Sequence, residues 1–538
     1  MKQATYHNIA SFLLKPLKHH FLFLLALFVF LTIPYLFLPY VFGARLYIAA
    51  HCFLYSYLIT LIVSLIKPIA VRRIVQIIIM VVITAFFVVN SYCCIELGYR
   101  IDADIVSLIQ QTDSNETSEF LSGMLPKGLI LFYIAVFLFF FILWLVSKRQ
   151  PISLGRKYPK VVLAGLGCCT AFAAYCWEGW EDGPLYFFKE LKSIENIDDL
   201  RPYYKKPSLI ANDTTAKSPN VVLIIGESFS RCHSSLYGYE KVTNPRLSVL
   251  KDNSLLFTFD DINSAYSTTS NSIKLMMSTY SKADKAKPNS KKWYECTNII
   301  QLMQECGYQC CWFSNQARWN KNNNTARLFG DACDKQWFLQ QEGGSNKVLS
   351  GTDMVLVDSS YQFVNHMPPQ ESHFIVYHMI GSHFTFSRRY PHHFAHFTSK
   401  DYESEPQEHR TLLATYDNSI LYNDFVVSRI IDLFKDKEAI ILYVPDHGQV
   451  MFRNPNDPDY YAHGNTHDRT SYALGVQIPF IIYASPLFQQ RHPETMQRIK
   501  YRQDHPKNWD TDDLPYLIMD LIGVVEIDGE STKKSLLN

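Results

Sequence analysis

Three polar side chains come directly after strand-like apolar runs, and their types are those that bind metal ions. Glu227 follows the mostly β-branched apolar run 221–225 and Gly226, and Asp446 and His447 follow the similar run 439–444 and Pro445. Ligands of open α/β sheets bind outside the carboxyl ends of the strands, so we expect these side chains to meet at one sheet edge. Each residue alone has a simpler explanation in a turn or near a helix cap. Together, two carboxylates and an imidazole favour a zinc or manganese site.

A stretch rich in hydroxyl groups offers a nucleophile for such a site. Residues 263–272 contain many Ser and Thr and run into the apolar Ile273, Leu275, Met276 and Met277. The pattern is typical of a turn that opens a helix, whose N-terminal amides can bind an anion. A capped Ser/Thr-rich loop is the more general alternative. Beside a metal ion, a hydroxyl deprotonated by the cation is a credible nucleophile, and residue type alone does not choose between Thr268 and Thr269.

The elements around these residues alternate between strand-like and helix-like patterns. Apolar strand-like runs follow the first one at 309–313, 374–380, 439–444 and 480–483. Helix-like spacing of apolar residues occurs between them, at 299–306 and 412–434. Such alternation predicts a largely parallel sheet covered by helices on both faces, an α/β fold.

The first third of the chain has a different composition, because its apolar residues are concentrated in long runs. Five segments approach the roughly 20 residues needed to cross a bilayer: 21–39, 46–66, 74–95, 128–147 and 160–177. The first is too long for a signal peptide and is followed by the other four. Basic residues are concentrated before the first span, between the second and third, and between the fourth and fifth. This asymmetry predicts a cytoplasmic amino terminus and an external carboxy-terminal domain.

These patterns predict the domain organisation. We expect a membrane domain of five transmembrane helices at 1–180, a bridging linker at 181–218 and a catalytic domain at 219–538. The external loop 96–127 is acidic but has an apolar face at helical spacing. It could form a helical hairpin on the bilayer surface or one wall of a lipid site, and the two interpretations are compatible.

Charge and cysteine content restrict the classes of partner and site. A net charge of +1 argues against a nucleic-acid-binding protein. Half of the twelve cysteines lie in or near the apolar spans and are expected to pack there: Cys52, Cys93, Cys94, Cys168, Cys169 and Cys176. The other six lie in the predicted external domain, where the oxidising compartment permits disulfides: Cys232, Cys296, Cys306, Cys310, Cys311 and Cys333. Cys310 and Cys311 should point to opposite faces of a strand. A zinc–thiolate site is the less favoured alternative, because the chain has no CxxC pair.

Several short motifs occur in a characteristic order along nearly the whole chain. They are Gln111-Thr112-Asp113 with Glu116, Gly226-Glu227-Ser228 with Arg231 and 235–239, 378–383, 416–420 with Asp424, Asp446-His447-Gly448, and His463-Gly464. In this order they resemble the phosphoethanolamine transferases, inner-membrane enzymes with a sulfatase-like domain of the alkaline phosphatase superfamily. Five membrane spans before one periplasmic domain is also that family's layout.

The resemblance implies roles for individual residues. Glu227, Thr269, Asp446 and His447 resemble the ligands of a catalytic Zn²⁺, and alignment through Met276-Met277-Ser278 selects Thr269 as the nucleophile. Two histidines, His383 and His463, resemble those that contact the substrate phosphate and the departing or attacking oxygen. Asn315 stands where the family places a polar substrate contact. The chain departs from lipid A-modifying members at Ala265 and Leu275, which replace a pair of disulfide-forming cysteines, and at Phe384 and Pro445.

The implied reaction moves phosphoethanolamine from phosphatidylethanolamine to Thr269, and then to lipid A, a lipopolysaccharide core or another envelope glycan. We expect a monomeric protein of the bacterial inner membrane with its catalytic domain in the periplasm. The alternatives are a phosphoglycerol transferase that uses phosphatidylglycerol, usually with manganese, and a non-catalytic lipid-binding homologue. A sulfatase is disfavoured because the chain lacks the Cys/Ser-x-Pro-x-Arg segment that forms a formylglycine.

Overall fold

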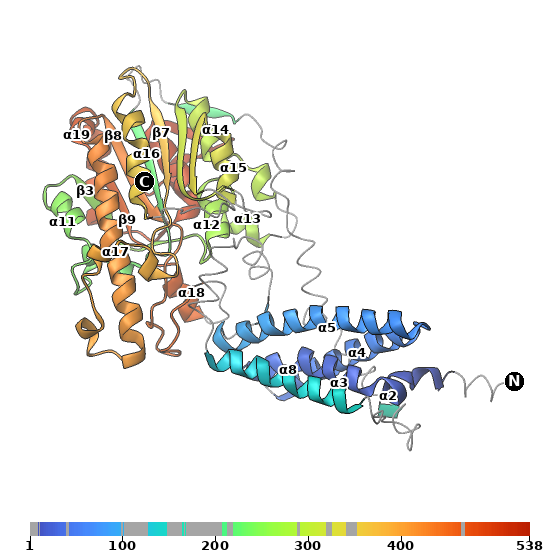
Figure 1. Ribbon diagram of the computed structural model, residues 1–538. Coiled ribbons are helices and arrows are strands. Elements are labelled where there is room, and N and C mark those ends of the chain that lie inside the picture. The colour runs from blue at the N-terminus through green and yellow to red at the C-terminus, as the bar shows by residue number, and fades with distance from the viewer. Residues whose placement is uncertain are drawn as a thin grey trace. The chain divides into compact units, whose positions relative to one another are not determined.

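The computed structural model describes residues 9, 11–38, 42–97, 100–101, 127–147, 164–165, 167, 207–211, 219–287, 291–318, 325–340, 352–463 and 469–538. The chain divides into two compact units, one formed mainly by residues before 195 and the other mainly by residues from 195 onward (Figure 1). Each unit is described by itself below.

The described part of the first unit is helical, and its helices after α2 (Lys15–His19) overlap the first four predicted spans. They are α3 (Phe21–Thr32) with the 3-10 turn η1 (Ile33–Phe37), α4 (Phe42–Ser64), α5 (Ile69–Tyr92) with the π-helical turn η2 (Cys93–Leu97), and α8 (Lys127–Ser147). Two of them, Phe42–Ser64 and Ile69–Ile95, are long and apolar enough to cross a membrane. Phe21–Phe37 and Gly128–Phe140 are shorter apolar helices. Most of the predicted fifth span and of the regions 96–127 and 181–218 lies outside the described residues.

Aromatic side chains fill the interior of this helical unit. The Phe30 ring stacks on Phe87 with ring centroids 4.9 Å apart and meets Phe140 edge-on at 5.2 Å. The cysteines Cys52, Cys93 and Cys94 are buried thiols here. They pack as apolar residues, as their sequence context predicts.

A seven-stranded sheet forms the centre of the second unit. Its strand order is β3-β9-β8-β2-β7-β5-β6, formed by β3 (Leu256–Phe259), β9 (Phe480–Ala484), β8 (Ala439–Pro445), β2 (Asn220–Gly226), β7 (His373–His378), β5 (Gln309–Ala317) and β6 (Lys335–Gln340). The five strands from β8 to β6 are parallel. The prediction of a largely parallel sheet is therefore confirmed, although β9 and β3 run antiparallel to their neighbours.

The central strand β2 explains why the sheet needs two helical layers. All seven of its residues are buried, and it pairs with β7 on one side and β8 on the other. Its side chains alternate between two cores. Leu223 belongs to the core with Trp312 and Leu517, and Ile224 to the core with Tyr416 and Ile430. A strand buried on both faces has a continuous apolar run rather than an alternating one.

Helices cover both faces of the sheet, as Figure 1 shows. Core residues of one face come from α12 (Thr269–Met276), α14 (Ile299–Glu305), α15 (Thr325–Ala332), α19 (Pro486–Arg491), α20 (Pro493–Asp504) and α21 (Leu514–Leu521). The other face is packed by α11 (Pro245–Asp252), α16 (Met354–Asn365) and the long α17 (Gln407–Phe434). Besides short 3-10 helices, the other described elements are α13 (Lys282–Ala286), α18 (Arg469–Gly475) and the short strands β1 (Leu209–Ala211), β4 (Ile262–Asn263), β10 (Trp509–Asp510), β11 (Val524–Ile527) and β12 (Glu530–Ser531).

The cysteines of this unit are thiols wherever the structure describes them. Cys310 lies in one core and Cys311 in the other, which confirms that they point to opposite faces of β5.

Candidate metal centre and active site

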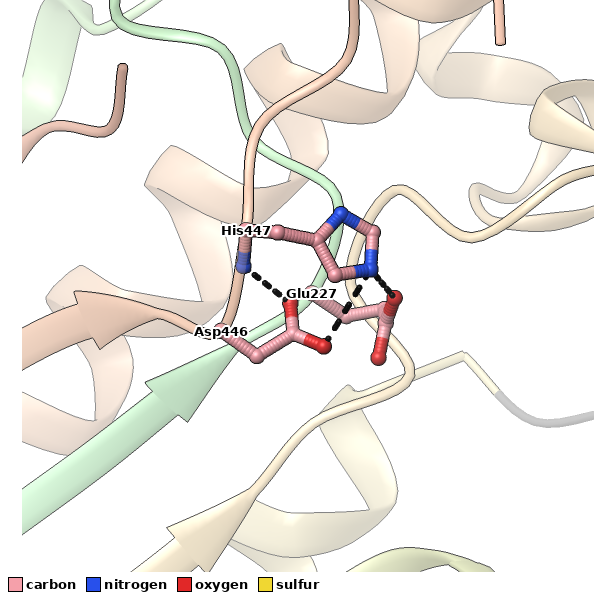
Figure 2. A group of neighbouring side chains, drawn as sticks. All are labelled: Glu227, Asp446 and His447. Carbon is pink, nitrogen blue, oxygen red and sulfur yellow. Dashed lines mark hydrogen bonds and ion pairs between the residues drawn. The ribbon is translucent and has the colours of Figure 1, made fainter. Parts of the chain in front are cut away.

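The carboxyl ends of β2 and β8, which are neighbours in the sheet, bring three ligand-type side chains together. Glu227 follows β2, while Asp446 and His447 follow β8, and all three are at most 1% exposed. Each offers one ligand atom, and these atoms lie within 4.8 Å of one another (Figure 2). His447 Nε2 is 3.3 Å from Glu227 Oε1 and 3.4 Å from Asp446 Oδ2. The structure thus assembles the predicted cluster at the predicted sheet edge.

Hydrogen bonds outside the cluster fix which atoms face its centre. The backbone amides of Ser228 and His447 donate to Asp446 Oδ1 at 3.2 and 2.7 Å. Among the described residues, Asp446 Oδ2 has no hydrogen-bond partner, although it is buried. His447 Nδ1 lies 2.9 Å from the Gly448 carbonyl oxygen. A proton donated there leaves the Nε2 lone pair directed toward the carboxylates. The centre is therefore lined by electron-pair donors.

The electrostatics of the cluster favour a cation. Burial, together with the neighbouring Glu227 carboxylate, raises the pKa of Asp446 to about 8. Burial alone would lower the pKa of His447, but Asp446 and Glu227 raise it to about 9. Burial would likewise raise the pKa of Glu227, yet the hydrogen bond with His447 holds it below its usual range. Two buried carboxylates need compensating positive charge. A divalent ion supplies it, and an O, O, N donor set fits zinc.

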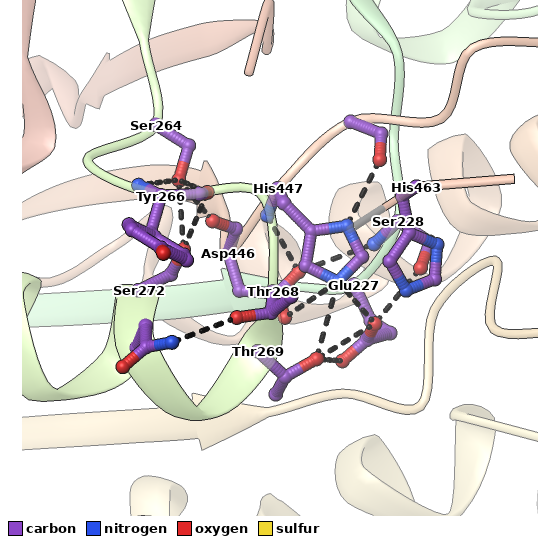
Figure 3. Close-up of polar contacts among 12 residues, drawn as sticks. Glu227, Ser228, Ser264, Tyr266, Thr268, Thr269, Ser272, Asp446, His447 and His463 are labelled. Carbon is purple, nitrogen blue, oxygen red and sulfur yellow. Dashed lines mark hydrogen bonds and ion pairs between the residues drawn. The ribbon is translucent and has the colours of Figure 1, made fainter. Parts of the chain in front are cut away.

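Thr269 lies beside this cluster as the first residue of α12. Its Oγ1 is 3.1 Å from His447 Nε2 and 3.4 Å from each Glu227 carboxylate oxygen (Figure 3). The preceding Thr268 has extended backbone and is the N-cap residue. Its Oγ1 instead accepts a hydrogen bond from Asn271 Nδ2 at 3.2 Å. The hydroxyl-rich stretch thus opens a helix, as its pattern predicted, and Thr269 rather than Thr268 contacts the cluster.

Other hydroxyls of the same segment hold α12 against the end of β8. The Ser264 hydroxyl donates to the Asp446 carbonyl oxygen and lies 3.0 Å from Ser272 Oγ. Ser272 Oγ also donates to the Tyr266 carbonyl oxygen at 2.7 Å. The apolar residues that follow, Ile273 and Met276, anchor the helix in the core. The hydroxyl-rich stretch therefore both presents Thr269 and fixes its distance from the metal ligands.

His463 lies against His447, with ring centroids 4.1 Å apart. Its Nδ1 is 2.7 Å from Gln449 Oε1, and Gln449 Nε2 donates to the Tyr461 carbonyl oxygen, which fixes the orientation of the amide. Burial and the nearby His447 hold the pKa of His463 well below its usual range. A neutral ring that donates through Nδ1 keeps Nε2 as an acceptor. Sequence reasoning missed Gln449, whose partner lies 14 residues away in the chain.

His383 follows β7, the other neighbour of β2. It is half-buried, and its Nδ1 donates to the Phe384 carbonyl oxygen at 2.7 Å. The loop that carries it is held from behind by the buried Asp353, which accepts from the amides of Ile380 and Gly381 at 2.8 Å each. Asp353 had no recognisable signal in the sequence, because an acid before a helix is ordinary.

The structure places Asn315 behind this loop, where its amide donates to Asp353 Oδ1 at 2.8 Å. Its neighbour Gln316 instead reaches the cluster. Gln316 Nε2 is 3.4 Å from Glu227 Oε2 and donates to the Met379 carbonyl oxygen at 2.9 Å. These hydrogen bonds direct Gln316 toward the metal ligands and Asn315 toward Asp353, where the pairing of β5 with β6 is irregular between Ser314 and Ala317.

One turn of α17 supports the loops that follow β2 and β7. The Tyr416 hydroxyl donates to the Ser228 carbonyl oxygen at 2.8 Å and accepts from the Ser230 amide at 2.9 Å. The Ser419 hydroxyl donates to Ser382 Oγ at 2.9 Å, next to His383. The predicted segment 416–420 thus acts by positioning the loops and does not enter the cluster. The motif at 111–113, with Glu116, and Gly464 lie outside the described residues.

Comparisons with known proteins identify the families that the two parts of the chain match. The sulfatase family matches residues 219–524, and the family described as phosphoethanolamine transferase EptA/EptB matches residues 58–181. Phosphoethanolamine transferase EptC of Escherichia coli O18:K1:H7 (strain RS218 / NMEC) is 24% identical over 481 residues, which cover 82% of this chain and 78% of the relative.

Two solved structures share the fold. The integral membrane protein lipooligosaccharide phosphoethanolamine transferase A from Neisseria meningitidis superposes with a TM-score of 0.66 and 16% identity, over 97% of each chain. The C-terminal periplasmic domain of EptC from Escherichia coli, solved in complex with Zn, has a TM-score of 0.53 and 24% identity, covering 62% of this chain and 90% of that domain. The chain therefore belongs to the phosphoethanolamine transferase family, with a sulfatase domain over residues 219–524.

Proposed function

We propose that this protein transfers phosphoethanolamine from phosphatidylethanolamine to a glycolipid or glycan of the cell envelope. The observation that carries the proposal is the position of Thr269, whose Oγ1 lies 3.1 Å from His447 Nε2 at the first turn of α12. A hydroxyl at a helix N-terminus, beside a cation site, is suited to attack phosphorus and to hold the phosphoryl group afterward.

Glu227, Asp446 and His447, with Thr269, are the residues that would hold Zn²⁺, the ion present in the related EptC domain. When bound, zinc lowers the pKa of the Thr269 hydroxyl and neutralises charge on the phosphoryl oxygens. Its charge also removes the need for protons on the buried carboxylates.

In the first half-reaction, Thr269 Oγ1 forms a bond to phosphorus as the bond from phosphorus to the diacylglycerol oxygen breaks. His383 and His463 each donate through Nδ1 to a fixed acceptor, so each presents Nε2 to the substrate. One of these rings accepts the proton of the Thr269 hydroxyl on Nε2 and passes it to the departing diacylglycerol oxygen. The amides of the first turn of α12 stabilise the phosphoryl oxygens of the phosphothreonine.

In the second half-reaction, an acceptor oxygen attacks the same phosphorus and the bond to Thr269 Oγ1 breaks. The Nε2 of His383 or His463 removes the proton of an acceptor hydroxyl and returns it to Thr269 Oγ1, which reverses the first proton transfer. Gln316 keeps Glu227 oriented throughout, since it lies 3.4 Å from Glu227 Oε2. Asn315 and Asp353 hold the His383 loop in place.

We place the donor in the outer leaflet of the inner membrane. This placement follows from the topology predicted from the sequence, with five membrane spans in 1–180, a linker at 181–218 and the domain 219–538 in the periplasm. We propose that the protein is active as a monomer. The long apolar helices Phe42–Ser64 and Ile69–Ile95 are consistent with it.

Mass spectrometry of the threonine adduct tests the proposal. The full-length protein is incubated with vesicles that contain phosphatidylethanolamine, and the peptide with Thr269 is analysed. The expected result is a phosphoethanolamine adduct on Thr269 and release of diacylglycerol. An adduct formed only from phosphatidylglycerol would support a phosphoglycerol transferase instead. A protein with neither bound zinc nor an adduct from either lipid would support a non-catalytic lipid-binding role.

A further inference from the structure

The loop 448–463 begins and ends at the active site. It follows His447 and ends at His463, and the rings of these two histidines lie 4.1 Å apart between centroids (Figure 3). Two backbone hydrogen bonds join its outgoing and returning arms, from the Val450 amide to the Ala462 carbonyl oxygen at 3.2 Å and from the Phe452 amide to the Tyr460 carbonyl oxygen at 2.8 Å. Because the two arms are joined, the contacts of either arm help to determine where His463 lies.

The outgoing arm has an unfavourable backbone conformation. Met451 and Phe452 are consecutive residues with φ of +47° and +62°. Residues other than glycine disfavour this left-handed region, so the conformation persists only where the surrounding structure imposes it. Burial holds Met451, which is 1% exposed and belongs to the core that α17 packs against. Phe452 is only half-buried against that core, so its position depends on the contacts of its ring.

His409, near the start of α17, contacts both arms of the loop. Its ring stacks on the Phe452 ring, with centroids 3.8 Å apart and 7° between the planes. Its Nε2 donates to Asp459 Oδ1 in the returning arm at 2.8 Å. The side chain of His409 is 6% exposed and that of Asp459 is 82% exposed, so the buried stack is the stronger contact. The Phe452 ring in turn lies 5.5 Å from the ring of Tyr461, two residues before His463.

The helix that carries His409 already supports two other loops of the active site. The Tyr416 hydroxyl donates to the Ser228 carbonyl oxygen, and the Ser419 hydroxyl donates to Ser382 Oγ. His409 stands seven residues before Tyr416, which is about two helical turns, so both residues lie on the same side of α17. The contacts of His409 thus extend the support of this helix to the third loop.

We propose that His409 is a positioning residue for His463, which it holds in place through the loop 448–463. The inference rests on the proposed function, in which His463 transfers a proton, and adds a residue on which that transfer depends. If His409 only stabilised the domain, its replacement would lower the overall stability without loosening this loop and without acting through His463.

Variants of His409 in the full-length protein separate these two roles. His409→Ala removes both the stack and the hydrogen bond, whereas His409→Phe keeps a ring on Phe452 and loses only the hydrogen bond. The matched control is His492→Ala. His492 likewise stacks on a phenylalanine, Phe488, with centroids 4.4 Å apart, and its Nε2 lies 2.8 Å from a carboxylate oxygen of Glu438. It stands between α19 and α20, outside the loop 448–463.

Limited digestion with trypsin measures how firmly the loop is held, without any turnover. Arg453 is exposed in this loop directly after Phe452, and cleavage after it requires the loop to open. His409→Ala should be cleaved at Arg453 about tenfold faster than the unmodified protein, as expected for the loss of a buried aromatic pair and a hydrogen bond. His409→Phe should stay within about twofold of the unmodified rate, because an exposed partner such as Asp459 contributes little. His492→Ala should leave this rate unchanged.

A double-mutant cycle tests whether His409 acts through His463. Formation of the Thr269 adduct is followed by mass spectrometry on vesicles of phosphatidylethanolamine, and its decay is followed after addition of lipid A. His409→Ala should slow by about tenfold each half-reaction that His463→Ala slows, because a displaced ring transfers protons poorly. The double variant should be no slower than His463→Ala alone, since the two changes then remove the same function.

The outcomes separate this inference from the proposed function. Independent losses that multiply in the double variant would overturn the inference, as would equal cleavage at Arg453 in His409→Ala and the unmodified protein. The same rise in cleavage at Arg453 in His492→Ala would also overturn it, because the effect would then be one of overall stability. Failure of the unmodified protein to form any adduct would overturn the proposed function, while the digestion still decides whether His409 holds the loop.

Discussion

The backbone of Gly381 lies directly against the backbone of Glu227. A Cβ atom at Gly381 would stand 2.8 Å from both the amide nitrogen and the carbonyl oxygen of Glu227. The amide of Ser382 also donates to the Glu227 carbonyl oxygen at 3.0 Å. The loop with His383 and the strand end with the first metal ligand are therefore joined through their main chains.

Substitution of Gly381 by alanine should separate these two parts of the site. Gly381 has a φ of +49°, so alanine adds backbone strain to the clash with Glu227. We expect a loss of about 1–3 kcal/mol of folding stability and at least a hundredfold loss of transfer activity. Thermal unfolding and an adduct assay would measure the two effects. Gly238→Ala is the control, since Gly238 has a φ of +90° but nothing lies within 4 Å of its Cβ position. Near-normal activity of Gly381→Ala would show that the contact is unimportant.

Removal of single ligands should remove the metal. Purified protein should hold about one tightly bound zinc per chain, and Glu227→Ala or His447→Ala should lose both the zinc and the activity. Elemental analysis after dialysis gives the occupancy. Asp424→Asn serves as the control, because Asp424 is also a buried carboxylate but accepts from the amides of Arg246 and Leu247 at the start of α11. Full zinc occupancy in either ligand variant would exclude that residue from the site.

The two adjacent threonines should behave differently. Thr269→Ala should abolish the phosphoethanolamine adduct, because the Thr269 hydroxyl, and not that of Thr268, faces Glu227 and His447. Thr268→Ala should keep the adduct, with activity lowered at most modestly, because the Thr268 side chain caps none of the described amides of α12 and its Oγ1 accepts from Asn271 Nδ2. Peptide mass spectrometry locates the modified residue. An adduct on Thr268 that persists in Thr269→Ala would contradict the assignment.

The predicted membrane topology can be tested with reporter fusions. A reporter that is active only in the periplasm should be active when fused after Asn538 and inactive when fused near Gln150, in a loop rich in basic residues. A second reporter, active only in the cytoplasm, should give the reverse pattern and serves as the control. Activity of the periplasmic reporter at Gln150 alone would overturn the orientation.

The cluster was predictable because its residues directly follow buried strands. The apolar runs before Glu227 and Asp446 identify the strands, and a parallel sheet brings such strand ends together. The direction of β9 was not predictable, because a short apolar run looks the same in a parallel strand as in an antiparallel one. The choice between Asn315 and Gln316 depends on where β5 ends. Sequence reasoning ended that strand at Phe313, whereas it continues to Ala317 with an irregular register between Ser314 and Ala317, which strand alternation does not predict.

Positioning residues were the least predictable part of the site. Asp353 and Gln449 are ordinary polar residues in the sequence, and their importance depends on the partners that the fold provides. Tyr416 belonged to a motif, but its contact with Ser228 links residues 188 positions apart. No local pattern encodes such pairs, because they follow from the packing of α17 on the sheet.

The pairing of β2 with β8 has a consequence for how the enzyme matures. Ser228 and Asp446, which are joined by a hydrogen bond at the metal centre, lie 218 residues apart in the chain. The ligands therefore meet only after most of the domain has been synthesised and the two strands have paired, and such long-range pairing is slow. A domain translocated before it folds would acquire its cation in the compartment where the sheet assembles. The zinc supply of the cell envelope, and not that of the cytoplasm, would then set the fraction of enzyme that becomes active.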